Sequence, residues 1–535
     1  MAAAEKKRKI LICDPLDEAG RKILESVKGF VLVEAIKASV PELKRQIRDA
    51  EAVVVRSGTK LTGEIIREGK CLKIIGRAGV GIDNVDLEAA SKKGVVVANT
   101  PSGNTISAAE HTLSLLLGMA RNIAPAHQSM CQGQWERKKF TGVELFEKTL
   151  GLIGLGRIGT EVARRAQSFS MRVLAYDPFL RAEKAAELGV TLAKLDDIYT
   201  QSDFISLHVP KTPETRRMIG ADAVRKMKKG VRIVNCARGG LLDEDVVLKG
   251  LESRKIAGLA LDVYEEEPPA PSPLLDHPSV LKTPHLGAST EEAQLKVSID
   301  IARTVADYLQ GKGLRNAVNV QSVEPEILKE MESSIDLAEK IGKVAAALVS
   351  GQFLKADVCL AGKIAEYPTS PITAALLKGL LGAILAEDVN VVNAVFLARE
   401  RGLEVTVSQT EALGNYSNLI QLKLKTAKGE HSVSGTLYNR QDPRIVAVDD
   451  LRVESVAKGH LLAVENRDVP GMVGYVGTLL GKSKVNIADM SVGRDRQKKR
   501  ARIFINVDAP VSEAILRKIR TNKNILDARM ICFGA

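Results

Sequence analysis

The sequence predicts an α/β protein with two doubly wound parallel sheets, followed by a smaller α/β segment and a ferredoxin-like sandwich. Three observations predict this. A glycine-rich turn lies between an apolar run of strand length and a helix pattern at 149–169, Val/Ile/Leu-rich runs alternate with helical patterns up to residue 309, and residues 453–535 follow the order β-α-β-β-α-β. The 535 residues suggest about three or four domains.

The glycine-rich turn is the most informative stretch. Thr149 to Ile153 form the apolar run, and Gly154, Gly156 and Gly159 follow in the spacing G-x-G-x-x-G. The first glycine permits a tight turn, the second lets the backbone approach a pyrophosphate, and the third lets helix and strand pack closely. The next strand ends at Asp177, 18 residues after Gly159. An acid at this place binds the adenosine ribose hydroxyls and repels a 2′-phosphate, so the stretch predicts a Rossmann-like lobe that binds NAD rather than NADP. The structural alternative is a turn that only helps packing.

A first parallel sheet is predicted before this unit, because short apolar runs occupy 8–13, 30–34, 52–55, 73–76 and 95–98. Two of its loops are polar or glycine-rich, at 56–59 and 76–81. Open α/β sheets bind ligands at the carboxyl ends of their strands. The candidate substrate contacts are therefore Arg56, Ser57, Gly58 and Gly79. Ordinary βα loops that bind no ligand explain these residues equally well. A helix after Asn104 carries apolar residues on several faces and is predicted to be buried between lobes or subunits.

Polar or glycine groups follow four successive strands of the second sheet, 203–207, 231–235, 256–261 and 281–283. Arg238, Glu267 and His285 are among them, and their meeting beside a nicotinamide predicts a hydroxy-acid dehydrogenase. The planar fork of Arg238 would bind a substrate carboxylate. His285 would accept the hydroxyl proton as hydride leaves, and Glu267 would orient the imidazole. Taken singly, each residue can also be explained without a catalytic role, since a lone histidine is more often structural and residues 265–267 could be a solvated loop.

The C-terminal part contains no catalytic motif. The helix at 290–309 is predicted to return to the first lobe and make that lobe discontinuous. Beyond it, 319–451 mixes helix patterns at 326–348 and 371–387 with strands at 404–408 and 419–425, which suggests a spacer or regulatory domain. In the final sandwich the loop 466–471 opens the first helix and Asn486 follows that helix.

The composition of the chain argues against several classes of function. The formal net charge is +12, but no nucleic-acid motif with interleaved aromatic residues accompanies it, so an anionic small-molecule substrate and a solvated basic surface are the preferred account. The six cysteines form no C-x-x-C motif, which indicates a reducing compartment and no metal site. No apolar run reaches the roughly 18 residues of a membrane span. The charged N-terminal residues lead into a strand without an apolar signal region, so we expect a cytoplasmic protein.

Five motifs resemble those of the D-isomer-specific 2-hydroxyacid dehydrogenases. They lie at 76–86, 154–159, 236–240, 260–264 and 284–290. The tail is similar to that of long family members, which carry an intervening regulatory domain and a C-terminal ACT domain. The resemblance implies a substrate-binding domain of 1–101 and 290–318, an NAD-binding Rossmann domain of 102–289, an intervening domain of 319–451 and an ACT domain of 453–535. The activity implied is NAD-dependent oxidation of 3-phospho-D-glycerate to 3-phosphohydroxypyruvate, the first step of phosphorylated L-serine synthesis, with reduction of 2-oxoglutarate to 2-hydroxyglutarate as a side reaction.

The resemblance also implies roles for single residues. Arg238, Glu267 and His285 form the implied catalytic set. The implied NAD contacts are Gly154, Gly156, Arg157, Ile158, Gly159, Asp177, Val209, Pro210, Cys236, Ala237, Arg238, Asp262, His285, Gly287, Ala288 and Val80. Asp468 and Asn486 map to the serine site of the ACT domain, but Asn466 stands where the family has histidine or tyrosine, which leaves serine inhibition open. A homo-oligomer, dimer or tetramer, is implied, in which the run Arg137-Lys138-Lys139 reaches a neighbouring subunit's site.

Other functions share parts of this pattern. A different D-2-hydroxyacid dehydrogenase, acting on glycerate, hydroxypyruvate or lactate, has the same fold. Formate oxidation is disfavoured because it needs no proton-accepting His–Glu pair. An NAD-sensing transcriptional corepressor is disfavoured by the complete arginine, glutamate and histidine set. A purely amino-acid-sensing module leaves the first 316 residues without a role.

Overall fold

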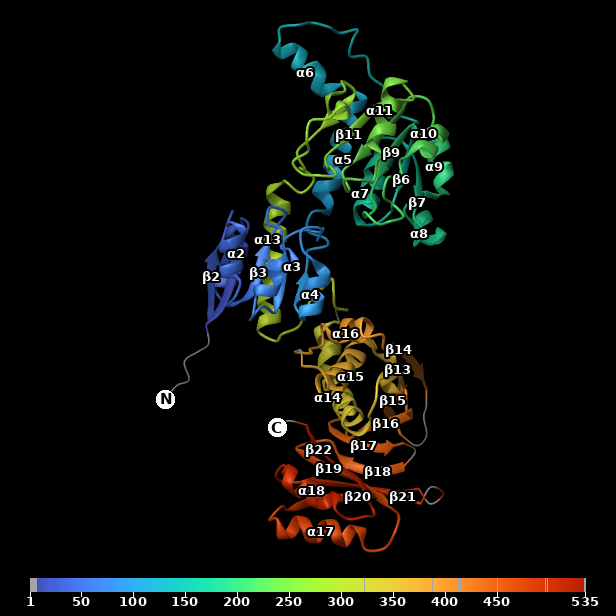
Figure 1. The fold of residues 1–535 in the computed structure, drawn as a ribbon. Helices are drawn as coiled ribbons and strands as arrows, with labels where there is room; N and C mark the ends of the chain where they lie inside the picture. The colour runs from blue at the N-terminus through green and yellow to red at the C-terminus, as the bar shows by residue number, and fades with distance from the viewer. Residues whose placement is uncertain are drawn as a thin grey trace.

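The structure is a computed structural model that describes residues 7–533, except 322, 387, 412–415, 450, 496 and 498. Within these ranges the strands form four sheets, which lie along an elongated molecule in the order second, first, third and fourth (Figure 1). The first two sheets are parallel throughout, the third is mixed and the fourth is antiparallel. This arrangement confirms the predicted fold class.

The first sheet has the strand order β2-β1-β3-β4-β5. Its strands are β1 (Arg8–Ile12), β2 (Phe30–Glu34), β3 (Ala50–Val55), β4 (Ile74–Arg77) and β5 (Val96–Ala98), joined by α1 (Glu18–Glu25), α2 (Val40–Gln46), α3 (Gly63–Glu68) and α4 (Leu87–Lys93). All six residues of β3 are buried, as expected for a central strand covered on both faces. Helix α13 (Glu291–Leu309) packs against α1 and β4, and Ile301 and Val305 contribute to the core of this lobe. The helix predicted at 290–309 therefore does return to the first lobe.

The second sheet has the order β12-β11-β10-β9-β6-β7-β8. Its strands are β6 (Thr149–Ile153), β7 (Arg172–Tyr176), β8 (Thr191–Leu192), β9 (Phe204–Leu207), β10 (Val231–Asn235), β11 (Ile256–Leu261) and β12 (Val280–Lys282). Its helices are α5 (Thr105–Ala120), α6 (Ile123–Cys131), α7 (Arg157–Ser168), α8 (Ala182–Glu187), α9 (Leu195–Gln201), α10 (Ala221–Lys226), α11 (Glu244–Glu252) and α12 (Pro273–Asp276). The direction of winding reverses between β6 and β9. Doubly wound sheets bind dinucleotides at such a switch point, outside the carboxyl ends of the strands.

The third sheet has the order β14-β13-β15-β16-β17-β18. Its elements are α14 (Pro325–Leu348), β13 (Phe353–Gly362), the short helix η1 (Lys363–Glu366), α15 (Ser370–Gly382), α16 (Ala394–Glu400), β14 (Glu404–Thr410), β15 (Asn418–Thr426), β16 (Gly429–Tyr438), β17 (Asp442–Val448) and β18 (Leu451–Val456). The sequence pattern identified two of these strands and two helices. The helix predicted to run to 387 ends at Gly382, because a turn at residues 383–384 follows it.

The last sheet has the order β20-β21-β19-β22, which confirms the predicted ferredoxin-like sandwich. Its elements are β19 (His460–Arg467), α17 (Met472–Lys482), β20 (Ile487–Asp495), β21 (Arg500–Val507), α18 (Glu513–Arg520) and β22 (Ile525–Cys532). One hydrophobic core joins Phe504 and Ile531 of this sheet to Ile341 of α14, and Arg529 donates a hydrogen bond to the carbonyl of Ala347 at 2.7 Å. The two C-terminal segments therefore share a core. The domain division at 451–453 stays a prediction; β18 itself pairs with β17 of the third sheet.

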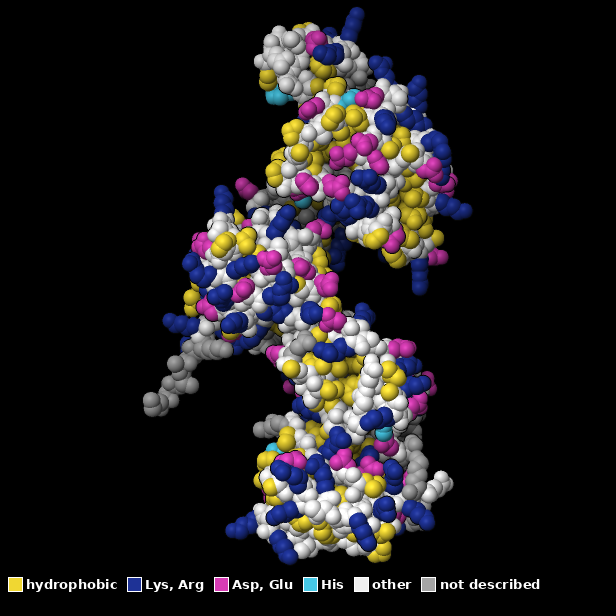
Figure 2. Space-filling model, viewed as in Figure 1, with side chains coloured by type: hydrophobic (Ala, Val, Ile, Leu, Met, Phe, Trp, Pro, Cys, Tyr) yellow, Lys and Arg dark blue, Asp and Glu magenta, His cyan; other side chains and the backbone are white. Residues whose placement is uncertain are grey.

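The third segment also contacts the first lobe. The side-chain amide of Asn390 donates to the carbonyl of Gly94 at 3.0 Å, and that of Asn393 donates to the carbonyl of Lys92 at 3.3 Å. Val392, between them, is buried with the apolar residues of the first lobe. Lys and Arg side chains are spread over all parts of the face shown in Figure 2, as expected for a solvated basic surface. Among the described helices, none combines the length and apolar character required to cross a membrane.

Candidate active site

The glycine-rich turn has the geometry that dinucleotide binding requires. Gly154 has a φ of +95°, and a Cβ there would collide with the backbone of His208. A Cβ at Gly159 would collide with the carbonyl of Gly154, so this glycine lets α7 begin against β6. Gly156 faces open space, with no atom within 4 Å of a Cβ placed on it, and the N-terminus of α7 next to it has no side-chain cap. A pyrophosphate fits there, where helix N–H groups attract anions.

Asp177 follows β7 and lies at this turn. Its carboxylate accepts the backbone N–H of Leu155 at 2.9 Å with one oxygen and that of Phe179 at 2.9 Å with the other. Each carboxylate oxygen keeps further lone-pair sites for a ribose hydroxyl. The negative charge held here opposes the 2′-phosphate of NADP. The residues present therefore fit NAD, although the contacts of Asp177 with its ribose stay a prediction.

Glu267 and His285 meet at the carboxyl edge of the second sheet. Nδ1 of His285 lies 2.6 Å from Oε2 of Glu267, while Oε1 of Glu267 accepts the backbone N–H of Tyr264 at 3.2 Å. A carboxylate at Nδ1 places the proton on that nitrogen, so Nε2 is left as the basic atom. The imidazole is 45% exposed and can reach a substrate in the cleft.

The backbone of His285 is in the left-handed region, with a φ of +56°. A non-glycine residue keeps such a conformation only where the surroundings hold it. Asp262, which is completely buried, does this: its carboxylate accepts the N–H of Leu286 at 2.7 Å and of Gly287 at 2.8 Å. Burial alone would raise the pKa of Asp262, but the hydrogen bonds from His111, Thr283 and Leu286 outweigh it and lower that pKa. The contact predicted between Asp262 and NAD stays a prediction.

Arg238 reaches from the second lobe to the first. Its Nε lies 3.1 Å from Oδ2 of Asp83, and a Cβ on Gly81 would collide with its guanidinium. The arginine is only one third exposed, whereas Asp83 is mostly exposed. A substrate carboxylate would therefore exchange with the carboxylate of Asp83 at this guanidinium.

The two predicted substrate loops are tied together. Asp14 accepts the N–H of Arg56 at 2.6 Å and that of Thr59 at 3.2 Å. Asn84, three residues after the second loop, donates to the carbonyls of Arg56 and Thr59, both at 2.6 Å. These bonds fix the direction of the loop that carries Arg56, Ser57 and Gly58.

Arg77 lies beside the predicted substrate loops and is absent from the residues predicted from the sequence. It is the last residue of β4, and its side chain fills the space beside Gly79, where a Cβ would collide with it. Its pKa is lowered to about 10, mainly by burial and then by the positive charges of Arg238 and Arg56. Its buried Nε has no hydrogen-bond partner among the described residues. An arginine directly after a strand, beside a glycine loop, was the available signal.

Four other predicted NAD contacts follow strands β9 and β10 at the same edge. Val209 and Pro210 follow β9, and the side chain of Val209 touches the position of Gly154. Cys236 and Ala237 follow β10; burial raises the pKa of the Cys236 thiol to about 12, so it stays protonated. Arg157 crosses to the first lobe and donates to the carbonyl of Pro101 at 3.2 Å.

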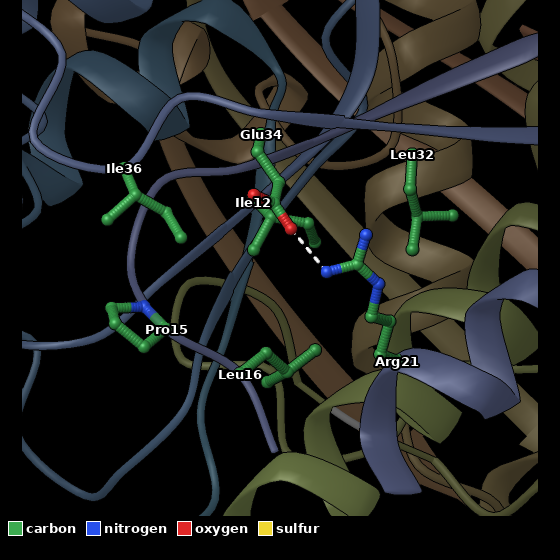
Figure 3. A pocket seen from close by; sticks show the side chains of 7 residues that line it. All are labelled: Ile12, Pro15, Leu16, Arg21, Leu32, Glu34 and Ile36. Carbon is green, nitrogen blue, oxygen red and sulfur yellow. Dashed lines mark hydrogen bonds and ion pairs between the residues drawn. The ribbon is translucent and has the colours of Figure 1, made fainter. Parts of the chain in front are cut away.

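Two other features lie away from this cleft. Helix α6 and the loop carrying Trp135, which is 74% exposed, project from the second lobe (Figure 1). The contact of this arm with a neighbouring subunit stays a prediction. A cavity of about 130 Å³ opens in the first lobe between β1, β2 and the start of α1, with the ion pair of Arg21 and Glu34 in its lining (Figure 3). None of the predicted site residues lines it.

The predicted effector residues of the last sheet are engaged within the chain. Asp468 forms an ion pair with Arg494 of β20, with Nε 3.0 Å and 3.1 Å from the two carboxylate oxygens and Nη2 3.0 Å from one of them. Asn486 donates to Asp508 at 2.7 Å. Asn466 is buried, and its side-chain oxygen has no hydrogen-bond partner among the described residues.

Three family models match the chain. They are "D-isomer specific 2-hydroxyacid dehydrogenase, NAD binding domain" at 113–287, "D-3-phosphoglycerate dehydrogenase intervening domain" at 330–449 and "ACT domain" at 460–524. The chain thus contains an NAD-binding domain and an ACT domain.

Similar proteins extend over nearly the whole length. A D-3-phosphoglycerate dehydrogenase of Archaeoglobus fulgidus is 43% identical over 98% of this chain and 99% of that protein, and one of Synechocystis sp. is 42% identical over 97% and 94%. The human D-3-phosphoglycerate dehydrogenase is 44% identical over 76% of each chain.

Solved structures match more than half of the chain. D-lactate dehydrogenase of Escherichia coli is 31% identical, covers 58% of this chain and 99% of its own, and has a TM-score of 0.52. D-lactate dehydrogenase of Aquifex aeolicus, complexed with NAD and lactic acid, is 29% identical over 57% and 96%, with a TM-score of 0.51. The extent of the similarity to the full-length relatives decides the family: the chain belongs to the D-3-phosphoglycerate dehydrogenases.

Proposed function

We propose that this protein oxidises 3-phospho-D-glycerate to 3-phosphohydroxypyruvate with NAD, as the first step of L-serine synthesis. Besides membership of the family, one observation supports this substrate, namely the distribution of charged residues around the site. The His285–Glu267 pair and Arg238 belong to the lobe with the glycine-rich turn, while Arg56 and the half-buried Arg77 belong to the first lobe. A substrate with an anion at each end of a secondary alcohol fits this distribution of charges.

Each residue has one task in the reaction. Arg238 binds the carboxylate through two parallel N–H groups and fixes the alcohol carbon next to it. Nε2 of His285 accepts the hydroxyl proton, and the carboxylate of Glu267 stabilises the imidazolium that results. NAD, when bound at the glycine-rich turn, would supply the acceptor for the hydride that leaves the alcohol carbon. Gly156, the first turn of α7 and Asp177 hold the pyrophosphate and ribose in the proposed complex.

The phosphate end is assigned to the first lobe. Arg77 is half-buried beside two other cations, so an anion there would give its buried Nε a hydrogen-bond partner and would reduce the repulsion between the charges. Arg56 is placed by Asp14 and Asn84 at the same edge. Both guanidinium groups can bind a phosphate with paired N–H donors.

A substrate panel tests this assignment. We expect rapid NADH formation with 3-phosphoglycerate, slow turnover of unphosphorylated glycerate and lactate, and little activity with NADP. Arg56→Ala should reduce kcat/KM for 3-phosphoglycerate by about 10–100-fold, the value of a hydrogen bond to a charged group, and should change glycerate oxidation little. Lys60→Ala, in the same loop region, is the control. Equal loss with both substrates would remove Arg56 from the phosphate site, and faster oxidation of lactate would point to another hydroxy acid.

We further propose that the protein is a homo-oligomer and that the ACT domain binds L-serine as an inhibitor between two copies. The ammonium group would bind Asp468, and Asn486 of the second copy would bind the carboxylate or hydroxyl. Because Arg494 already occupies Asp468, serine must displace this guanidinium.

The expected result is that serine inhibits the intact protein and that Arg494→Gln lowers the serine concentration needed for half inhibition. Asp468→Asn should abolish inhibition, and Arg517→Gln, on the exposed face of α18, should leave it unchanged. Truncating the chain near 452 is unsuitable because the ACT sheet shares a core with α14. If Asp468→Asn is inhibited like the intact protein, serine binds elsewhere.

A further inference from the structure

Two side chains of α5 contact the loop that carries His285. Oγ of Ser107 donates to the carbonyl of Gly287 at 2.9 Å, and this bond is buried. Nε2 of His111 lies 3.1 Å from Oγ1 of Thr283 and 3.1 Å from Oδ1 of Asp262. The two residues are four positions apart, so they lie on one face of the helix. Helix α5 follows the segment in which the chain first crosses from one lobe to the other.

The proton on the His111 ring can be assigned from its neighbours. The hydroxyl of Thr283 donates a hydrogen bond to Oδ1 of Asp262, with a distance of 2.6 Å between the oxygens. Both atoms near Nε2 of His111 are therefore acceptors, and Nε2 must carry a proton. The buried carboxylate of Asp262 consequently receives donors from α5, from β12 and from the backbone after His285.

We propose that His111 and Ser107 are positioning residues that hold catalytic His285 in place through Asp262 and Gly287. This inference rests on the role of His285 in the proposed function. Neither side chain needs to touch the substrate. Both bind the segment 283–287 at points on either side of His285, so helix α5 determines where the imidazole stands.

The backbone of His285 makes such support necessary. Its left-handed conformation is retained only while neighbouring bonds hold it. If the loop relaxes, Nδ1 moves away from Glu267 and Nε2 moves away from the alcohol. A displacement of about 1 Å at a reacting group can cost about 10²-fold in rate. The loss would fall mainly on kcat, because the hydrogen bonds of Ser107 and His111 lead to the loop that carries His285 and not to the glycine-rich turn or Asp177.

The experiment compares His111→Leu, His111→Gln and Ser107→Ala in the full-length protein. We expect kcat for 3-phosphoglycerate to fall about 10–100-fold in His111→Leu and about 10-fold in Ser107→Ala, with a smaller change in the KM for NAD. In His111→Gln the side-chain amide places an N–H near the position of Nε2, so kcat should recover to within about threefold of the unmodified protein. Ser114→Ala is the control, since this exposed hydroxyl of α5 bonds only within its own helix, to the carbonyl of Glu110.

A second measurement needs no substrate. Hydrogen–deuterium exchange should become faster at the amides of Leu286 and Gly287 in His111→Leu and Ser107→Ala, and not in Ser114→Ala. Unchanged exchange and unchanged kcat in both variants would overturn the proposal. So would a His111→Gln variant as slow as His111→Leu, because ring shape rather than the donated hydrogen bond would then matter. An intact protein inactive on 3-phosphoglycerate would refute the proposed function, while the exchange measurement would still decide the positioning role.

Discussion

Replacing His285 by alanine is expected to lower kcat for 3-phosphoglycerate oxidation by about 10²–10⁴-fold, the usual contribution of a positioned general base. The physical reason is the arrangement of the imidazole. Its Nδ1 is 2.6 Å from Glu267, which leaves Nε2 as the base, and no other imidazole among the described residues is paired with this glutamate. Without it the hydroxyl proton must leave to water while hydride departs.

The measurement is steady-state NADH formation together with calorimetric titration of NAD. Binding of NAD should change little, since the glycine-rich turn is intact. Glu267→Gln should show a smaller loss of kcat. Its amide oxygen can still accept a hydrogen bond from Nδ1–H of His285, but it carries no charge to stabilise the imidazolium. His277→Ala, at the end of α12 in the same lobe, is the matched control. Turnover of His285→Ala near that of the unmodified protein would require another base.

Arg238→Lys is expected to lower kcat/KM by about 10²-fold, although the charge is retained. A bidentate pair of charged hydrogen bonds contributes about 3 kcal/mol at its upper range, and a lysine ammonium cannot offer two parallel donors to a carboxylate. The guanidinium also contacts Asp83 of the other lobe, so the substitution weakens the bridge across the cleft.

Asp83→Asn separates these two effects. It removes the carboxylate that occupies Arg238 and should lower the KM or leave it unchanged, since no acid then competes with the substrate. A loss in Asp83→Asn as large as that in Arg238→Lys would mean that the bridge between the lobes, and not the substrate carboxylate, is the important partner. The readout is kcat and KM for 3-phosphoglycerate in both variants.

Much of the fold was determined by local patterns. The alternation of buried strands and amphipathic helices, the strained turn at Gly154 and the small residue at Gly159 are each required by backbone geometry within a few residues. The order of strands then brings Arg238, Glu267 and His285 to one sheet edge, because carboxyl ends of parallel strands share an edge. The ferredoxin-like end of the chain was predicted from its order of strand and helix patterns, β-α-β-β-α-β, which is also local information.

Other features depend on groups far apart in the sequence, and only the tertiary structure decided them. Arg77 lies half-buried near Arg56 and Arg238, which follow two other strands. His111 reaches Asp262 across 151 positions, and Arg494 neutralises Asp468. The helix-free face of the ACT sheet is covered by α14, which joins two segments into one core. Ion pairs and shared cores are set by distances between side chains in space, and neither periodicity nor motif spacing contains those distances.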